Sequence, residues 1–174
     1  MNIKVMSRSE AKRFTRSHIG LNNDKSKDQY LIISISDRYQ EPPTFRYDPD
    51  LLGVCYLNFD DVEKGEKNCI SEIDVYKLKL FLSGAFNKHT HVENIIVHCG
   101  AGVSRSAGMA AALMKFYNND DSPIFDNPKY CPNMTVYRMV LNSLMGDINE
   151  EEIKSKEEKN IMLWRKINGL DEEN

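Results

Sequence analysis

Apolar residues gather in short runs along the chain, and the longest runs have the length and composition of buried strands. Isoleucine, leucine and valine dominate these runs, and two of them stop at an aspartate. Runs of this length, rich in β-branched residues, are typical of strands that are covered on both faces. We therefore predict three buried strands, at 30–36, 51–59 and 92–99, after a shorter apolar segment at 3–6.

Two serines stand where capping residues would open helices. Ser7 precedes Glu10 by three positions, which is the spacing of a capping box. Ser71, with Asp74 three positions on, marks the start of a second helix. The first pair predicts a short helix over the segment SRSEAKRFTRS. The second predicts an amphipathic helix that ends near Asn87, with its apolar face formed by Ile73, Leu78, Phe81, Leu82 and Ala85.

The second half of the chain is mainly helical in pattern. A segment rich in alanine and methionine predicts a helix over 105–117, followed by a loop that runs to Pro132. Asn133 is placed to cap a helix that Gly146 would close. A last charged helix is predicted over 149–169, with apolar positions at Ile153, Ile161, Leu163, Trp164 and Ile167.

Strands that alternate with helices predict an α/β layered domain with a partly parallel sheet. A chain of 174 residues fits one ordinary domain and leaves little room for a second. We expect a single domain over 1–170 with no internal repeat. Only the acidic tail at 171–174 has the composition of a disordered segment.

Composition narrows the classes of partner. The formal net charge is -3, and acidic and basic residues are mixed along the chain. This pattern gives no broad basic face for nucleic acid or an anionic membrane. No apolar run approaches the roughly 18 residues that span a bilayer, and the start MNIKVMSRSEAKRF lacks the apolar core of a secretory signal. We expect a cytoplasmic monomer without nucleic-acid or membrane partners.

The cysteines and histidines do not predict a metal site. Widely spaced along the chain, the cysteines form no Cys-x-x-Cys pair and no Cys/His cluster. We expect free thiols in a reducing compartment, and neither a metal nor a cofactor. His89 and His91 fall in a polar turn and are better explained as solvated residues. The four cysteines are Cys55, Cys69, Cys99 and Cys131.

Candidate chemistry is concentrated where the strand at 92–99 meets the helix at 105–117. The carboxyl end of a strand and the first N–H groups of the next helix together form a seat for an anion in α/β sheets. The two glycines of the connecting loop would allow backbone angles that turn N–H groups inward. Arg105 adds a planar fork of donors that suits two phosphate oxygens. The loop residues are Gly100, Ala101, Gly102, Val103 and Ser104.

Cys99 would stand at the floor of this positive seat. The loop N–H groups, the helix dipole and the guanidinium all favour a thiolate there, and a thiolate facing phosphorus is a nucleophile in position. The alternative is a buried cysteine followed by a surface arginine. The spacing of Cys99 and Arg105 alone does not separate these two, whereas His98, Gly102 and Ser106 around it favour the phosphate site.

The segment HCGAGVSRSAG resembles the active-site loop of Cys-based protein tyrosine and dual-specificity phosphatases, whose pattern is His-Cys-x5-Arg-Ser/Thr. FDDV, HVENIIVHC and PNMTVYRMV are similar to segments of the small dual-specificity-type enzymes of bacteria and phages. The resemblance implies a three-layer fold in which helices flank a mixed, largely parallel sheet. It also implies phosphomonoester hydrolysis through a phosphocysteine, without metal or cofactor.

The resemblance also implies roles for single residues. Cys99 would attack phosphorus, and Arg105 with the loop N–H groups would hold the phosphate oxygens. Ser106 matches the hydroxyl that stabilises the leaving thiolate in the second step. His98 matches the histidine that orients the loop and tunes the thiol.

A general acid should come from a loop some thirty to forty residues before the cysteine, as it does in the resembled family. Asp60 and Asp61 directly follow the strand at 51–59 and meet this requirement. We favour Asp61 and keep Asp60 as its rival, with a turn carboxylate as the alternative for both. Asp74 is better explained by its helix N-terminus. Asp37, also at a strand end, is expected to be a structural or rim residue.

Several residues and the substrate class stay open. Cys55 is a core residue or a redox partner of Cys99, and Arg138 stabilises its helix or lines the cleft. Because the loop has no Lys or Arg before Arg105, a monophosphate ester is favoured, and phosphotyrosine in a protein or peptide, with or without phosphoserine and phosphothreonine, is the first expectation. A non-protein ester (nucleotide, RNA 5′ end, sugar or lipid) and a weakly active phosphate-binding module are alternatives. An aromatic wall for a phosphotyrosine ring is one role for the three aromatic residues of the proline-rich loop, and packing within the core or the loop is the other. These residues are Tyr39, Phe45 and Tyr47.

Overall fold

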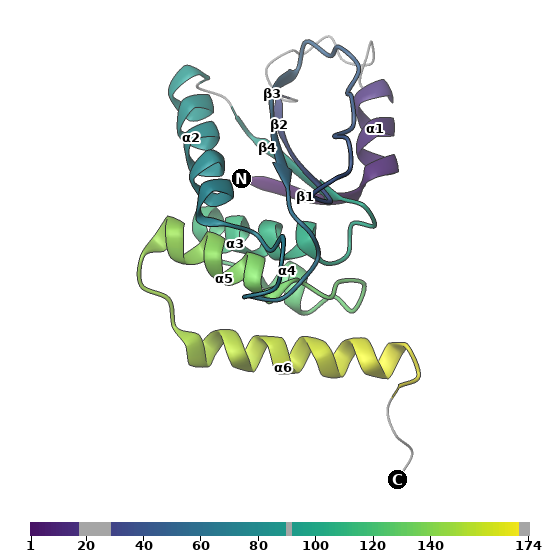
Figure 1. The fold of residues 1–174 in the computed structure, drawn as a ribbon, viewed down its shortest axis with the longest axis vertical. Helices are drawn as coiled ribbons and strands as arrows, with labels where there is room; N and C mark the ends of the chain where they lie inside the picture. Colours follow the sequence, from purple (N-terminus) through teal and green to yellow (C-terminus); the bar gives the residue numbers. More distant parts are fainter. Residues whose placement is uncertain (18–28, 90–91, 171–174) are drawn as a thin grey trace.

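A computed structural model describes residues 1–17, 29–89 and 92–170 of the chain (Figure 1). The expected acidic tail at 171–174 and His91 lie outside these residues. In chain order, the elements of the described residues are β1 (Asn2–Ser7), α1 (Arg8–Ser17), β2 (Tyr30–Ser36), β3 (Leu51–Asn58), α2 (Glu72–Lys88), β4 (Asn94–Cys99), α3 (Arg105–Asn118), α4 (Ser122–Phe125), α5 (Met134–Met145) and α6 (Glu150–Ile167).

The four strands form one sheet in the order β1-β4-β2-β3. All three pairings are parallel, so the described sheet is parallel throughout rather than mixed. Parallel neighbours need a crossover connection. Helices lie in the connections from β1 to β2 and from β3 to β4, whereas residues 37–50 connect β2 to β3 without a helix. The predicted α/β arrangement is confirmed.

Helices cover both faces of the sheet, because alternate residues of a buried strand point to opposite sides. On one face, Tyr30, Ile32 and Ile96 pack with Phe14 of α1. On the other face, a larger core brings strand residues such as Ile33 together with α2, α3 and α5. Figure 1 shows α1 on one side of the sheet and the larger helical layer on the other. The expected three layers are present.

The strand predictions differ from the structure at one edge. β2 is buried along its whole length, as predicted. β3 lies at the edge of the sheet and is only partly buried, with Tyr56 41% exposed. The prediction of a fully buried strand at 51–59 is therefore wrong, because an apolar run cannot by itself tell a central strand from an edge strand. The apolar start of the chain is the strand β1 at the opposite edge.

The predicted capping box at Ser7 is present, and Ser71 with Asp74 forms another. The Ser7 hydroxyl accepts the Glu10 N–H at 3.2 Å, and the Glu10 carboxylate accepts the Ser7 N–H at 2.7 Å. Ser71 and Asp74 make the same two bonds at 3.3 and 3.0 Å. The expected apolar face of α2 is wrong at Ile73, which is 69% exposed. The helix turns Val75 into the core instead.

The region after α3 holds a feature that the sequence pattern missed. A single helical turn, α4, lies inside the segment predicted as loop, with Pro123 in its first turn. Phe125 of α4 packs edge-on against Tyr137 at a centroid distance of 5.1 Å. The stretch is too short to show helical periodicity, so only these tertiary contacts reveal it.

The predicted helix 134–145 is confirmed, with Asn133 accepting the Val136 N–H at 3.0 Å and Gly146 at its C-terminal cap. Arg138 forms ion pairs with Glu150 at 3.1 Å and Glu157 at 2.9 Å, and so ties α5 to α6. Of the apolar positions expected on the last helix, Ile153 is buried and Ile167 is 64% exposed. None of the helices in the described ranges combines the length and apolarity needed to cross a membrane.

Candidate active site

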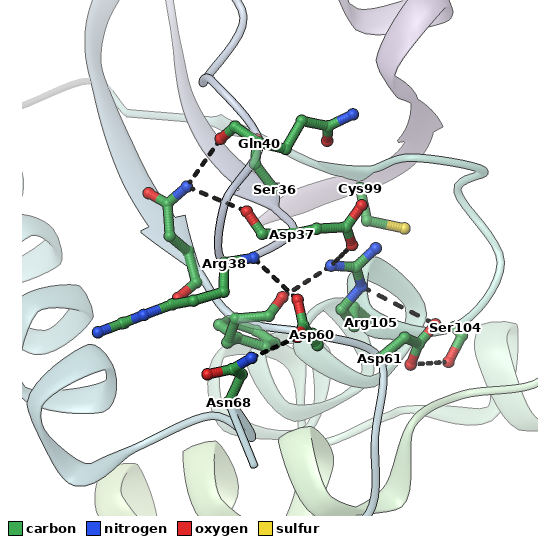
Figure 2. Close-up of polar contacts among 12 residues, drawn as sticks. Ser36, Asp37, Arg38, Gln40, Asp60, Asp61, Asn68, Cys99, Ser104 and Arg105 are labelled. Carbon is green, nitrogen blue, oxygen red and sulfur yellow. Dashed lines mark hydrogen bonds and ion pairs between the residues drawn. The ribbon is translucent and has the colours of Figure 1, made fainter.

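The candidate site lies where the carboxyl ends of β2, β3 and β4 meet. Asp37 follows β2, Asp60 and Asp61 follow β3, and Cys99 ends β4. Figure 2 shows Asp37, Asp61, Ser104 and Arg105 turned toward one another close to Cys99. The carboxyl ends of the strands in a parallel sheet are where α/β proteins bind their ligands. We refer to residues 100–104 as the Cys99 loop and to residues 60–68 as the Asp61 loop.

Gly102 determines the course of the Cys99 loop. Its φ is +78°, a left-handed conformation, and a Cβ at this position would lie 2.6 Å from the Met6 carbonyl carbon and the Ser7 nitrogen. No other residue type fits there without moving β1. Gly100, in contrast, has no positive φ, and a Cβ added there would meet no atom within 4 Å. The expectation that both glycines serve the turn is therefore wrong for Gly100.

Three backbone hydrogen bonds hold the Cys99 loop from outside. The Arg8 N–H donates to the Gly100 carbonyl at 3.1 Å, and the Cys131 N–H donates to the Val103 carbonyl at 3.1 Å. The Asn133 N–H donates to the Ser104 carbonyl at 3.2 Å. The loop is thus braced by the start of α1 on one side and by the segment before α5 on the other.

Cys99 is 2% exposed and lies at the floor of the loop. Its Sγ accepts the Gly102 N–H at 3.3 Å and lies 3.1 Å from the Ser106 hydroxyl. The structure therefore brings together the three residues that sequence analysis grouped as thiol, loop amide and hydroxyl. Such donors stabilise negative charge on sulfur.

The Arg105 guanidinium is buried beside two carboxylates. Its NH1 group contacts the Asp37 carboxylate at 2.7 Å and donates to the Phe59 carbonyl at 2.7 Å. Its Nε lies 3.8 Å from the Asp61 carboxylate and has no hydrogen-bond partner among the described residues. Arg105 is therefore positioned by β2 and β3, with one buried donor left for a ligand.

Asp37 belongs to this site, although we expected it at the rim or in a structural role. Its contact with Arg105 makes it the carboxylate that aligns the guanidinium. A signal was available in the sequence. Asp37 ends a strand just as Asp60 and Cys99 end theirs, and parallel strands bring their carboxyl ends to one edge.

The two candidate acids have different surroundings. Asp61 accepts the Ser104 hydroxyl at 2.8 Å and the Asn133 amide at 2.9 Å, beside Arg105. Asp60 accepts the Arg38 N–H at 2.8 Å and the Asn68 amide at 2.9 Å. The hydrogen bond from the Arg38 N–H, followed by that from Asn68, lowers the pKa of Asp60. Asp61 thus faces the Cys99 loop, whereas Asp60 bonds to Asn68 at the far end of the Asp61 loop and to Arg38 in the segment after β2.

Asn133 and Ser104 make contacts that sequence analysis missed. Asn133 was predicted only as a helix cap, yet its amide also donates to Asp61 and, at 3.2 Å, to the Val62 carbonyl. Ser104 was expected only to line the phosphate seat, and its hydroxyl donates to Asp61. These bonds join positions 43 and 72 residues apart along the chain. A local pattern carries no signal for contacts so distant.

His98 is fully buried on the α1 side of the sheet. Its Nδ1 lies 3.4 Å from the Cys99 carbonyl oxygen, and the ring of Phe45 packs edge-on at 5.6 Å. Burial lowers the pKa of His98 to about 4. The imidazole is therefore neutral near pH 7 and lies behind the loop rather than beside the thiol.

The structure also places the other residues that were left open. β2 separates Cys55 on β3 from β4, and Ile33 pairs with both Cys55 and Val97. With strands about 4.8 Å apart, Cys55 lies roughly 10 Å from Val97 and farther still from Cys99. A disulfide needs Cα atoms within about 7 Å, so this arrangement excludes a Cys55–Cys99 bridge. Burial raises the pKa of the Cys55 thiol to about 11.

The proline-rich loop does not form an aromatic wall as a unit. Phe45 packs inward against Tyr56 and His98. Tyr39 and Tyr47 are each 84% exposed. Across the described ranges, no three His, Cys, Asp or Glu side chains gather as metal ligands would.

Comparison with known proteins gives no family assignment. No protein-family model and no curated protein matches the chain. A crystal structure of Tk-PTP in its active form is similar at 11% identity, over 91% of this chain and 88% of that chain, with a TM-score of 0.40. A mutant form of Tk-PTP is similar at 12% identity, over 96% and 92% of the two chains, also with a TM-score of 0.40. Likenesses this loose carry no functional weight.

Proposed function

We propose that the protein is a phosphatase that hydrolyses phosphomonoesters through a phosphocysteine on Cys99. The observation that carries this proposal is the contact of the Cys99 sulfur with the Gly102 N–H and the Ser106 hydroxyl, inside a loop that ends at Arg105. A buried thiol that served only in packing would not need this set of polar partners.

In the first step, the Cys99 thiolate attacks phosphorus while the bond to the ester oxygen breaks. The Nε donor of Arg105 and the loop N–H groups bind the phosphate oxygens, where negative charge is concentrated in the transition state. The departing alkoxide or phenoxide takes a proton from Asp61. A protonated Asp61 also removes one of the two negative charges that would otherwise face the dianion beside Arg105.

In the second step, a water molecule attacks the phosphocysteine and gives its proton to the Asp61 carboxylate. The sulfur–phosphorus bond breaks, and the Ser106 hydroxyl, 3.1 Å away, stabilises the sulfur as it leaves as a thiolate. Inorganic phosphate departs, and both Cys99 and Asp61 return to their starting protonation states. His98, neutral and behind the loop, supports the Cys99 carbonyl and transfers no proton.

The substrate class that we propose is phosphotyrosine in proteins or peptides, with phosphoserine and phosphothreonine as further substrates. The Cys99 loop carries no cationic side chain for a second phosphate. Tyr39 is exposed and follows Asp37 by two residues, which supports a contact with an aromatic ester at the rim.

The test is hydrolysis of an aryl phosphate, followed by mass spectrometry of acid-quenched protein. We expect wild type to turn over, Cys99→Ser to be inactive, and Ser106→Ala to accumulate a phosphoryl group on Cys99 because its second step is slowed. Cys99→Ser with full activity, or a phosphoryl group on another residue, would contradict the mechanism. Phosphotyrosine, phosphoserine and phosphothreonine peptides, compared with nucleotides and lipids, test the substrate class.

A further inference from the structure

The strand β1 presents an open edge. Among the described strands it pairs with β4 alone, through a ladder that begins with the Asn2 N–H donating to the Glu93 carbonyl at 2.8 Å. In a parallel ladder, alternate residues of a strand bond to the same neighbour. The even-numbered residues of β1 therefore face β4, and Ile3 and Val5 turn their N–H and C=O groups outward. Within 1–17, 29–89 and 92–170, no donor or acceptor pairs with these outward groups.

Ser7 confirms this alternation. Its N–H also points away from β4, and the Glu10 carboxylate of the capping box accepts it at 2.7 Å. The outward N–H of Ser7 is thus already bonded within the capping box of α1. The outward N–H and C=O groups of Ile3 and Val5 can instead bond to a partner outside the sheet.

A groove of about 650 Å³ runs along this open edge. Phe14 of α1 lines it from one layer of the fold, and Met114 of α3 and Ile124 of α4 line it from the other. Both helical layers thus extend past the last strand, and the floor between them is the edge of β1. A further strand seated in the groove would pair with Ile3 and Val5 and place alternate side chains against the two apolar walls.

Charge around the groove selects the partner. Lys4 is exposed, with its ammonium group 5.8 Å from the Phe14 ring, and Arg13 lines the groove. The Lys129 ammonium group lies 5.5 Å from the ring of Tyr130, which also lines it. Glu10 is the acidic residue in the lining, and its carboxylate is already bonded within the capping box. In a chain with a net charge of -3, this local excess of cations favours an acidic occupant.

The groove ends beside the Cys99 loop. Ser7, the last residue of β1, pairs with Cys99 in the register of the sheet. Tyr130 precedes Cys131, whose N–H bonds to the Val103 carbonyl. A polypeptide that lies along β1 therefore reaches the side of the candidate active site within a few residues.

We propose that the groove binds an acidic, extended segment of the protein substrate as an additional strand paired with β1. This inference rests on the proposed phosphatase function and adds a docking site for the substrate chain. Main-chain hydrogen bonds to Ile3 and Val5 supply the affinity, and the basic rim supplies the preference for acidic sequence.

The test is peptide binding to the full chain carrying Cys99→Ser, measured by fluorescence anisotropy. The probe is a fluorescein-labelled peptide of eight alternating Val and Glu residues followed by phosphotyrosine, together with a version ending in tyrosine. Val5→Pro removes an outward N–H and leaves the ladder to β4 intact. We expect this change to weaken binding of both peptides about tenfold or more.

Val54→Pro is the matched control. The Phe59 N–H donates to the Ser36 carbonyl, so odd-numbered residues of β3 face β2 and the Val54 N–H points outward at the opposite edge. This variant should bind like the parent. In the background with Cys99 intact, neither proline should change hydrolysis of a small aryl phosphate. Equal binding by Val5→Pro and the parent would overturn the docking site.

A second measurement needs no protein variant. Single N-methyl groups placed along the peptide should weaken binding at every other position, because only alternate N–H groups of an added strand face β1. A flat profile would overturn the proposal even if Val5→Pro failed to fold. A peptide with Gln in place of Glu should bind less tightly, and equal binding would contradict the acidic preference.

Two further outcomes distinguish substrate docking from dimer formation through β1, and the docking site from the phosphatase function. Sedimentation of the free protein as a dimer that Val5→Pro dissociates would assign the edge to a second copy of the chain, against substrate docking. Peptide binding that depends on Val5, in a protein that hydrolyses no phosphate ester, would refute the phosphatase function while leaving a peptide site in the groove.

Discussion

The Cys99 loop and the Asp61 loop face each other across the candidate site, yet they are held by different kinds of bond. The braces of the Cys99 loop run from backbone to backbone, from Arg8, Cys131 and Asn133. At Asp61 itself, the bonds to Ser104 and Asn133 run between side chains. A single side-chain change at Ser104 or Asn133 can therefore remove a bond to Asp61, whereas the braces of the Cys99 loop change only with its backbone geometry. In the proposed mechanism, the loop that binds phosphate is therefore held through its backbone, and the residue that exchanges protons is held through side chains.

The largest effect should come from Asp61→Asn. An amide cannot supply the proton that the leaving oxygen needs, so kcat should fall by about 10²–10⁴-fold for an alkyl or phenyl phosphate. A more acidic leaving group should reduce the loss. Steady-state kinetics with a series of aryl phosphates measures both effects.

Asp60→Asn is the matched control for that change. Its carboxylate bonds to Arg38 and Asn68 and lies away from the Cys99 loop, so it should affect stability more than kcat. If Asp60→Asn lost activity while Asp61→Asn kept it, the assignment of the acid would be reversed and the contrast between the loops would lose its basis.

Gly102→Ala should break the Cys99 loop itself. The new Cβ would approach the β1 backbone to 2.6 Å at a φ of +78°. We expect aryl phosphate hydrolysis to fall about 100-fold and the free energy of unfolding to drop by about 2–4 kcal/mol, because the loop and β1 must move apart. Urea denaturation and kinetics on the same preparation measure the two losses.

Gly100→Ala provides the comparison within the same loop. Gly100 has ordinary φ and open space around it, so its replacement should change the free energy of unfolding by less than about 1 kcal/mol. Equal losses for the two variants would show that Gly102 is not the residue that shapes the loop.

The pH dependence of stability should report His98. Burial lowers its folded pKa to about 4 from an ordinary 6.5, so between these values the unfolded chain binds the extra proton. Stability is then complete above pH 6.5 and falls as the pH drops toward 4, by about 3 kcal/mol in total. Urea denaturation of His98→Asn, measured between pH 4 and pH 6.5, should not show this fall in stability. An unchanged pH slope in the variant would show that His98 does not titrate in this way.

The smallest effect should come from Asn133→Ser. Serine keeps the N-cap of α5 but has no amide to donate to Asp61 and Val62. We expect kcat to fall about tenfold because Asp61 is held less firmly. The free energy of unfolding should drop by about 1–2 kcal/mol, since each of the two lost bonds is worth about 1 kcal/mol. Asn149→Ser, the same change at the cap of α6, should leave kcat unaltered. A loss of stability without a loss of kcat would show that the Asn133 amide does not hold Asp61 in its catalytic position.

Sequence analysis predicted what short-range geometry determines. The Ser7 capping box, the helix start at Ser71, the strand at 30–36 and the turn at Gly102 follow from residues within a few positions of one another. Because a local pattern reports only on residues close together in the chain, it also explains the errors. Edge and centre strands share one apolar pattern, so β3 was predicted too buried.

The candidate site was also predictable only where its contacts join residues close together in the sequence. The contacts of the Cys99 sulfur with Gly102 and Ser106 join residues within one motif. The Asp37–Arg105 ion pair and the Asn133–Asp61 bond join distant segments through the fold. The strand-end position of Asp37 could have assigned it to the site, but its ion pair with Arg105 depends on the fold. Asn133 caps α5, and no local pattern indicates its bond to Asp61.

The braces of the Cys99 loop also bear on how the protein is made. Of its three outer donors, one comes from residue 8 and two come from residues 131 and 133. A ribosome releases Cys99 well before it releases those last two residues. During that interval the growing chain carries the thiol and its glycine turn but lacks the segment that braces them. Full assembly of the site is thus a late event in synthesis, and a chain truncated before residue 131 would present a cysteine without the support that the folded protein gives it.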